Sequence, residues 1–178
     1  GSGLQSVMDN VYAGSTVQSQ ITPLTTMAVA RVQNMPGGLT ASNINAANQS
    51  IGTYFGGIDI LNTQPINPLV SGSASGASES AINYGLILAG LSLQVEALDL
   101  SNPFDLITAL AQDISDGTFD GQSGSTDVNL GGSPMNPTTW TSSLAAAINT
   151  FSQDTTINAS GGAVSDRLIT ALRYAAGT

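Results

Sequence analysis

Three segments of this sequence place a polar residue directly before a proline, and an apolar-periodic run follows each of them. The three pairs are Thr22-Pro23, Asn102-Pro103 and Asn136-Pro137. A Thr or Asn side chain accepts a hydrogen bond from a backbone N–H of the first helical turn, and proline has no N–H to leave unpaired there. Each pair therefore predicts the start of an α-helix.

Apolar residues recur at three- and four-residue steps after these starts and in three further segments. The spacing predicts helices over residues 23–35, 40–55, 77–98, 103–115, 137–152 and 164–177. The intervening stretches 57–78, 116–136 and 154–162 are rich in Gly, Ser and Asp, which predicts long irregular loops. We expect an all-α fold, a compact bundle of five to six helices.

The helical region has a short preceding segment. Residues 4–21 carry scattered apolar side chains without helical spacing, which predicts an extended segment or a weak hairpin. The helical domain covers residues 22–178, and residues 1–3, Gly-Ser-Gly, are typical of a cloning remnant. A chain of 178 residues with 41% hydrophobic content is long enough to bury the core of one domain.

The most apolar stretch, from Ala81 to Leu93, is apolar on nearly all sides. It holds 13 residues, Asn83 interrupts it, and Gln94 and Glu96 follow. A helix that spans a bilayer needs about 20 predominantly apolar residues. We therefore expect a helix at the centre of the core, and no membrane insertion by this segment.

The sequence contains no histidine, cysteine or lysine, and its only cations are Arg31, Arg167 and Arg173. Without histidine there is no imidazole general base and no Ser-His-Asp triad. Without cysteine there is no thiolate nucleophile or zinc–thiolate site, and without lysine there is no Schiff base. These absences remove most of the side chains that perform chemistry, so we predict a non-enzymatic protein.

Charge restricts the classes of partner. The formal net charge is −9, which disfavours binding to phosphate backbones and to anionic membranes. Only 8% of residues are charged, against about 25% in typical domains. Neutral polar side chains replace them, and such a surface suits an exported bacterial protein better than a cytosolic one.

An acidic segment is the first candidate site, since seven of the twelve acids lie within residues 96–127. Asp113, Asp116, Asp120 and Asp127 are candidate calcium ligands, because calcium takes six to eight hard oxygens. Their spacing departs from the EF-hand pattern. Aspartates that initiate turns in a solvated loop explain the same residues, so both interpretations stay open.

Paired carboxylates also allow a second class of function, glycoside hydrolysis. Such clefts usually hold sugars on aromatic platforms. Aromatic residues make up only 5% of the chain, and Phe104, Trp140 and Phe151 fall on core-facing stripes. The hydrolase therefore remains the alternative to a binding protein.

Tyrosines form the second candidate site. Tyr54 and Tyr84, with Tyr174 as a third, present an apolar ring and a polar hydroxyl that suit a carbohydrate or a peptide. The same properties suit the edge of a core where the hydroxyl stays wet. Arg31 has apolar neighbours on its helix, so we expect it to pair with a carboxylate or to cap backbone carbonyls. Any of the three arginines could bind an anion.

Several stretches share their sequence and their order with a known type of domain. They are ITPLTTMA at 21–28, LTASNINAANQ at 39–49, FG at 55–56, DILNTQP at 59–65, YGL at 84–86, AGLS at 89–92 and DISDGTFDG at 113–121. They resemble a helical domain of large exported bacterial proteins and lipoproteins, often found after an Ig-like β-domain. The resemblance implies a helical fold, surface or periplasmic display and attachment to a larger chain.

These observations predict a non-enzymatic interaction module for adhesion or ligand binding, excised from a larger exported bacterial protein. No signal peptide is present in the sequence, and we expect a secreted, cell-surface or periplasmic location. Expected partners are a protein or a glycan on a surface, or neighbouring domains, with calcium ordering the loop 113–127 as the one cofactor considered. The alternatives are a carboxylate-based glycan hydrolase and a purely structural spacer.

Overall fold

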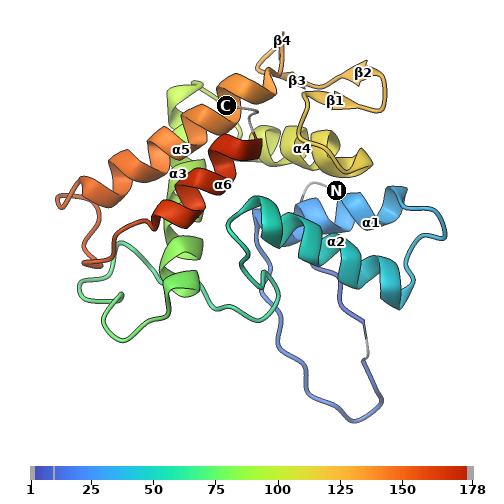
Figure 1. Cartoon of the computed structure of the whole chain (residues 1–178), viewed down its shortest axis with the longest axis horizontal. Helices are drawn as coiled ribbons and strands as arrows, with labels where there is room; N and C mark the ends of the chain where they lie inside the picture. Colours follow the sequence, from blue (N-terminus) through green and yellow to red (C-terminus); the bar gives the residue numbers. More distant parts are fainter. Residues whose placement is uncertain (1–2, 10, 176–178) are drawn as a thin grey trace.

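The computed structural model describes residues 3–9 and 11–175. Within this part the chain forms six α-helices, one short 3-10 helix and two small antiparallel hairpins (Figure 1). The helices are α1 (Pro23–Asn34), α2 (Ala41–Tyr54), α3 (Glu79–Ala97), α4 (Pro103–Asp113), α5 (Pro137–Gln153) and α6 (Asp166–Ala175). The 3-10 helix η1 (Ile114–Asp116) and the strands β1 (Gln122–Ser123), β2 (Thr126–Asp127), β3 (Asn129–Leu130) and β4 (Ser133–Pro134) lie between α4 and α5. The largely helical fold is confirmed. Residues 1–2 of the predicted cloning remnant 1–3, and the predicted helix end near Gly177, lie outside the described residues.

The three proline-marked helices begin where the sequence predicts. The Asn102 side-chain oxygen accepts a hydrogen bond from the N–H of Phe104 at 3.1 Å, and Asn136 accepts one from the first turn of α5 at 3.1 Å. At α1, Thr22 and Thr25 form a reciprocal capping box. Each cap satisfies a donor that the helix itself leaves unpaired, so the local sequence fixes the start of the helix.

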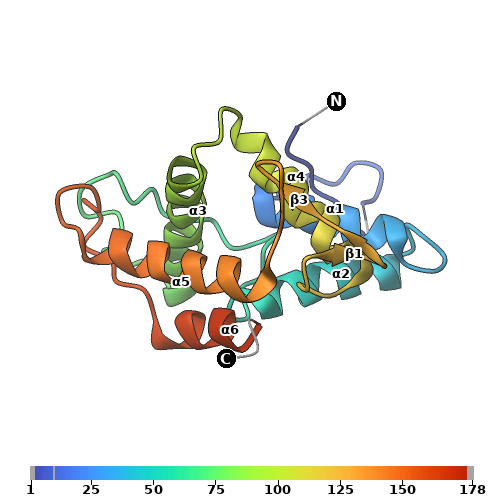
Figure 2. The same ribbon diagram turned by 90° about the horizontal axis from the view of Figure 1, so that it is seen from above.

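The helices form two groups that share one core (Figures 1 and 2). In one group α1 packs against α2 and α4, and in the other α5 packs against α3 and α6. Side chains of both groups meet in a single buried cluster that includes Leu24, Phe55, Leu86 and Leu144. The two groups also touch where α2 approaches α6.

Helix α3 lies in the core, as predicted from its nearly uniform apolarity. Leu86 and Ile87 are completely buried, and α5 packs along one side of the helix. At Gly90 a Cβ would overlap Cγ1 of Ile148 and lie 3.3 Å from its backbone nitrogen, so only glycine permits this approach of α5. None of the described helices combines the length and the apolarity needed to cross a bilayer.

Tyr84, predicted as a ligand-binding residue, lies in the core and not on a surface. Its side chain is completely buried. Its hydroxyl is 2.6 Å from Thr22 Oγ1 and donates to the carbonyl of Ile60 at 3.2 Å. Burial raises the pKa of Tyr84 to about 12, so the hydroxyl stays protonated and can donate at neutral pH. Tyr84 thus joins α3 to the start of α1 and to the loop after α2.

The prediction of an irregular loop at 116–136 was wrong in one respect, since two hairpins form there. Gly131 and Gly132 have φ of 62° and 82° and connect β3 to β4. Positive φ at both central residues is the requirement of a type I′ turn, which glycine meets without strain. Gly124, with φ of 65°, is the first turn residue between β1 and β2. The two-residue glycine turns therefore explain strands that an apolar periodicity does not reveal.

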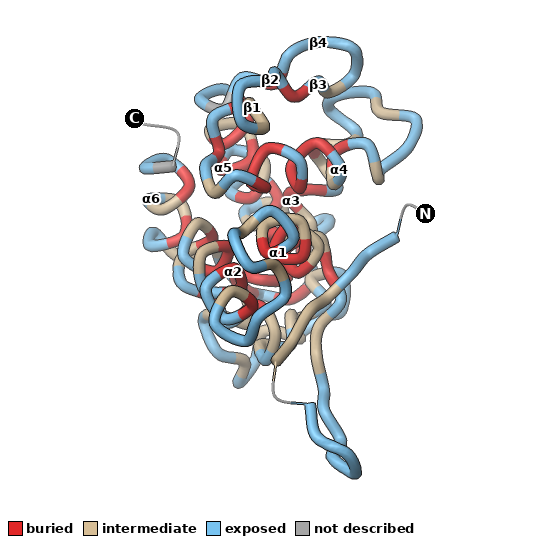
Figure 3. The backbone as a smooth tube through the Cα atoms, turned by 90° about the vertical axis from the view of Figure 1, so that its right-hand side faces the viewer, coloured by how far each residue is buried: buried red, intermediate tan, exposed pale blue. Residues whose placement is uncertain are grey.

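The N-terminal segment is extended, without helix or strand in its described residues 3–9 and 11–21. It projects from the helical body as an exposed loop (Figures 1 and 3). The Oγ atoms of Ser6 and Ser19 lie 2.8 Å apart, and Gln20 donates its N–H to the carbonyl of Leu61 at 3.1 Å. The two arms of the loop thus meet near the helices, but the hairpin alternative is not formed there.

Replacement of Gly90 by alanine tests the α3–α5 contact. Alanine normally stabilises a helix interior by about 1 kcal/mol relative to glycine. Here we expect Gly90→Ala to lower the free energy of unfolding by about 1–3 kcal/mol, because the new methyl group overpacks the contact with Ile148. Urea unfolding measures the change, and Ser92→Ala, on an exposed part of α3, is the control with an expected change within about 0.5 kcal/mol. A stabilised Gly90→Ala protein would contradict the packing.

Candidate functional site

Asp113, the first predicted calcium ligand, is completely buried at the end of α4. Its Oδ1 accepts backbone hydrogen bonds from Asp120 at 3.2 Å and from Gly121 at 2.8 Å. Its Oδ2 is buried and has no hydrogen-bond partner among the described residues. Burial raises the pKa of Asp113 to about 7, while the N–H groups of Gly121 and Asp120 oppose this rise and nearby carboxylates add to it. Asp113 therefore holds the backbone of the loop at Asp120 and Gly121 through its buried carboxyl group.

Asp116, Asp120 and Asp127 are exposed, and each holds a local turn or hairpin. Asp116 Oδ2 accepts the N–H of Gly124 at 2.7 Å. Gln122 donates to two of these carboxylates. Its backbone N–H donates to Asp120 Oδ1 at 3.0 Å, and its side-chain Nε2 donates to Asp127 Oδ1 at 3.0 Å. Partial desolvation raises the pKa of Asp116, but its hydrogen bonds, led by that of Gly124, outweigh this effect and keep the pKa below its ordinary value.

The four carboxylates are thus distributed over separate turns. Within residues 3–9 and 11–175, no group of three or more acidic side chains lies together in a way that could hold a metal ion. Calcium would need six to eight oxygens around one point. The hydrogen bonds favour the turn-forming interpretation, and calcium binding stays a prediction.

Arg31 caps a backbone carbonyl, one of the two roles predicted for it. Its Nη1 donates to the carbonyl oxygen of Ser115 at 3.2 Å. The guanidinium lies against Gly117, whose φ is 110° and where a Cβ would come within 2.8 Å of Nη2. Arg31 therefore ties α1 to η1, and its charge helps to lower the pKa of Asp116.

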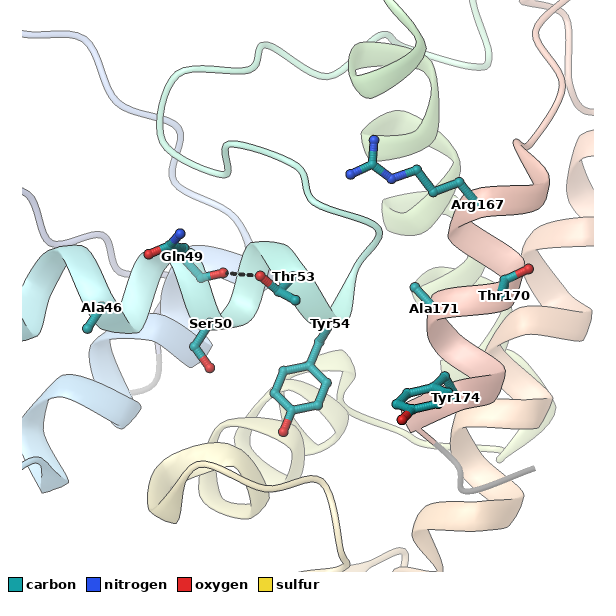
Figure 4. Close-up of a pocket in the computed structure, with 9 residues that line it drawn as sticks. All are labelled: Ala46, Gln49, Ser50, Thr53, Tyr54, Arg167, Thr170, Ala171 and Tyr174. Atoms are coloured by element: carbon teal, nitrogen blue, oxygen red, sulfur yellow. Dashed lines mark hydrogen bonds between the residues drawn. The ribbon is translucent and has the colours of Figure 1, made fainter.

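A groove of about 770 Å³ opens between α2 and α6, where the two helix groups meet (Figure 4). Each helix contributes positions at three- and four-residue steps, which form one face of a helix. The lining residues are Ala46, Gln49, Ser50, Thr53 and Tyr54 from α2, and Arg167, Thr170, Ala171 and Tyr174 from α6. Most of these side chains are small and neutral, and none is acidic.

Tyr54 is held in place from behind the groove. Its hydroxyl donates to the carbonyl of Gly117 at 3.0 Å, and its ring meets the ring of Phe119 edge-on with centroids 4.8 Å apart. Burial raises the pKa of Tyr54, so the hydroxyl is a donor at neutral pH. Because both the ring and the hydroxyl are fixed, Tyr54 offers a pre-positioned aromatic surface.

Arg167 and Tyr174 lie at opposite ends of the side of α6 that lines the groove. Tyr174 is 85% exposed and lies across the groove from Tyr54 (Figure 4). Arg167 extends from the first turn of α6 toward the α2 side, over Gly57. A ligand in the groove can therefore contact two aromatic rings and one guanidinium.

Sequence reasoning found part of this site. Tyr54 lines the groove and Tyr174 does too, whereas Tyr84 is in the core. The sequence shows the stripes Ala46 to Thr53 and Arg167 to Tyr174, but their pairing depends on how α2 and α6 pack, which no local pattern encodes. Comparisons with protein-family models, with curated proteins and with solved structures give no match for this chain.

Replacement of Asp113 by asparagine tests the buried carboxyl. The folded-state pKa of about 7 lies above the ordinary value of 3.8. The protonated form is therefore the stable one, and its contribution is full below pH 3.8 and lost as the pH rises through 7. Asparagine keeps the Oδ1 acceptor and carries no charge, so we expect Asp113→Asn to be more stable at pH 8 by on the order of 1–3 kcal/mol.

The measurement is the free energy of urea unfolding between pH 4 and pH 8. In the wild type this free energy falls as the pH rises, and in Asp113→Asn we expect most of that fall to be absent. Asp127→Asn, at an exposed position of the same loop, is the matched control and keeps the wild-type profile. An undiminished decline in Asp113→Asn would show that another group causes it.

A calcium titration separates the two interpretations of the loop. Since the carboxylates already accept protein hydrogen bonds, we expect calcium and EGTA to change the Tm by less than about 1 °C. A loop site saturated 100-fold above its Kd would contribute about 2.7 kcal/mol and raise the Tm by about 5–10 °C. A rise of that size, reversed by EGTA and absent in Asp116→Asn, would assign the loop to calcium.

Proposed function

We propose that this chain is a non-enzymatic module of an exported bacterial protein that binds a saccharide in the α2–α6 groove. The observation that carries the proposal is the pair Tyr54 and Tyr174 on opposite walls of a groove with small neutral side chains. The C–H faces of sugar rings pack on aromatic faces. Hydroxyl and amide side chains such as Ser50 and Gln49 match sugar hydroxyls as donors and acceptors.

The size and the lining of the groove support a saccharide more than a protein partner. A volume of about 770 Å³ falls within the range of about 300–1,000 Å³ that is usual for small-ligand sites. A stable protein interface involves about 20–30 residues on each partner, whereas nine residues line the groove. The groove has no Leu, Ile, Val or Met in its lining, and exposed aliphatic residues such as Leu69, Val70 and Leu98 lie elsewhere.

The lack of a carboxylate in the groove supports binding without hydrolysis. A glycosidase places two carboxyl groups on either side of the scissile bond. The groove lining contains neither Asp nor Glu, and Asp116 and Asp120 accept hydrogen bonds that hold turns of the loop. The hydrolase alternative therefore has no carboxylate pair at the place where we put the sugar.

Exported location remains part of the proposal. The resemblance of ITPLTTMA and DISDGTFDG to a helical domain of exported bacterial proteins supports it, and so does the low charged content of 8%. A module displayed in this way meets glycans of its own envelope or of its surroundings. In the alternative of a purely structural spacer, the groove has no ligand.

Replacement of Tyr174 by alanine tests the saccharide site. Saccharides that bind the wild-type protein on a glycan array are measured by calorimetry, and we expect Tyr174→Ala to weaken their binding at least about tenfold by removing one stacking wall. Because the Tyr174 side chain is 85% exposed, the free energy of unfolding changes by less than about 0.5 kcal/mol.

The control is Tyr12→Ala, a tyrosine that is 69% exposed in the N-terminal segment and does not line the groove. This variant keeps wild-type affinity. An array without any bound saccharide, or equal binding by Tyr174→Ala, would remove the proposal and leave the spacer alternative.

A further inference from the structure

We infer that the saccharide bound in the α2–α6 groove is an acidic oligosaccharide whose carboxylate is received by the Arg167 guanidinium. This inference rests on the saccharide-binding function proposed above and adds the chemical class of the ligand. It depends on three observations: the hydrogen-bond partners of Arg167, the acidic residues near it and its spacing from Tyr174 along α6.

Arg167 and Arg31 differ in the contacts of their guanidinium groups. Among the described residues, no carboxylate, carbonyl or hydroxyl accepts a hydrogen bond from its guanidinium, whereas Arg31 donates to the carbonyl of Ser115. The side chain lies over Gly57, where the absence of a Cβ leaves room for it. A planar guanidinium binds a carboxylate through two parallel hydrogen bonds. The Arg167 guanidinium can therefore bind a carboxylate of a ligand in the groove.

Two acidic residues lie near Arg167 in the sequence or in the loop after α2, and both make contacts elsewhere. Asp59 Oδ1 accepts the N–H groups of Leu61 and Asn62, each at 3.1 Å, and so closes its own turn. Asp166 lines a different cavity, together with Arg173. In a chain of net charge −9, an acid-free groove with one guanidinium is a local site where an anion is favoured.

The spacing of the anchors indicates the length of the ligand. Arg167 and Tyr174 are seven residues apart on α6, which corresponds to about 10 Å along a helix. A single pyranose ring is shorter than this distance. Since the two positions are about two helical turns apart, we expect a ligand with its carboxylate on Arg167 and a ring between Tyr54 and Tyr174 to contain at least two sugar units.

Binding of matched saccharide pairs tests the inference. The probes are oligogalacturonates, oligoglucuronates and sialyl-lactose on an array, each beside its methyl ester, with sulfated oligosaccharides as a further arm. We expect the wild-type protein to bind one of the carboxylated forms at least about tenfold more tightly than its ester, as measured by calorimetry. Arg167→Gln should weaken this binding by about 10- to 100-fold, because it removes a charge-assisted pair.

Two further variants separate the carboxylate contact from the net charge. Arg173→Gln removes the same charge outside the groove and keeps wild-type affinity. Arg167→Lys keeps the charge but lacks the planar fork, so its affinity lies between those of the wild type and Arg167→Gln.

The outcomes distinguish this inference from the function on which it rests. If the acid and its ester bind equally and Arg167→Gln has no effect, the carboxylate inference is wrong while saccharide binding stands. A preference for sulfated over carboxylated probes would also overturn it. If no probe binds to the wild-type protein and neutral glycans do not bind either, both proposals fail.

Discussion

The ring of Phe119 packs between the two helix groups and contacts aromatic rings of both. It meets Tyr54 of α2 edge-on at 4.8 Å between centroids and Trp140 of α5 at 5.4 Å, and it also lies 6.3 Å from Phe55. Edge-to-face pairs of this kind stabilise beyond their buried area. Since α6 packs on α5 and also contacts α2 directly, Phe119 contributes to the packing that holds α2 and α6 on the two sides of the groove.

Carboxylates of the acidic segment fix the backbone on both sides of Phe119 in the glycine-rich loop. On one side of Phe119, Asp116 accepts the N–H of Thr118 at 3.1 Å. On the other side, buried Asp113 accepts the N–H groups of the two residues that follow. The carboxylates clamp the backbone around Phe119, so the clustering of acids between α4 and β1 has a structural cause. The candidate metal site and the candidate tyrosine site are thereby parts of one arrangement, since Tyr54 donates to the carbonyl of Gly117 in the same turn.

The predictable part of this structure is the part that local sequence determines. Caps such as Asn102 and Asn136 and the apolar stripes behind them act within a few residues, and these helices begin where expected. The glycine pair Gly131-Gly132 was an equally local signal for a hairpin, hidden because the strands beside it are two residues long. Tyr84 and the groove could not be predicted, because a stripe shows which side of a helix is apolar but not which neighbour covers it.

The same distinction applies to the arginines. The sequence predicts a pairing or capping role for Arg31 and leaves anion binding open for all three arginines. Which contacts each of them makes depends on the tertiary structure. Arg31 donates to the carbonyl of Ser115 within η1 and so helps to hold the start of the loop that carries Phe119. Arg167 instead lies at the junction of the two helix groups, where packing brings α2 alongside it and no acid lines the groove. A chain with so few cations keeps its surface potential negative nearly everywhere. Arg167 is therefore the cation of the groove, at a place where none of the lining residues is an Asp or Glu that could pair with it.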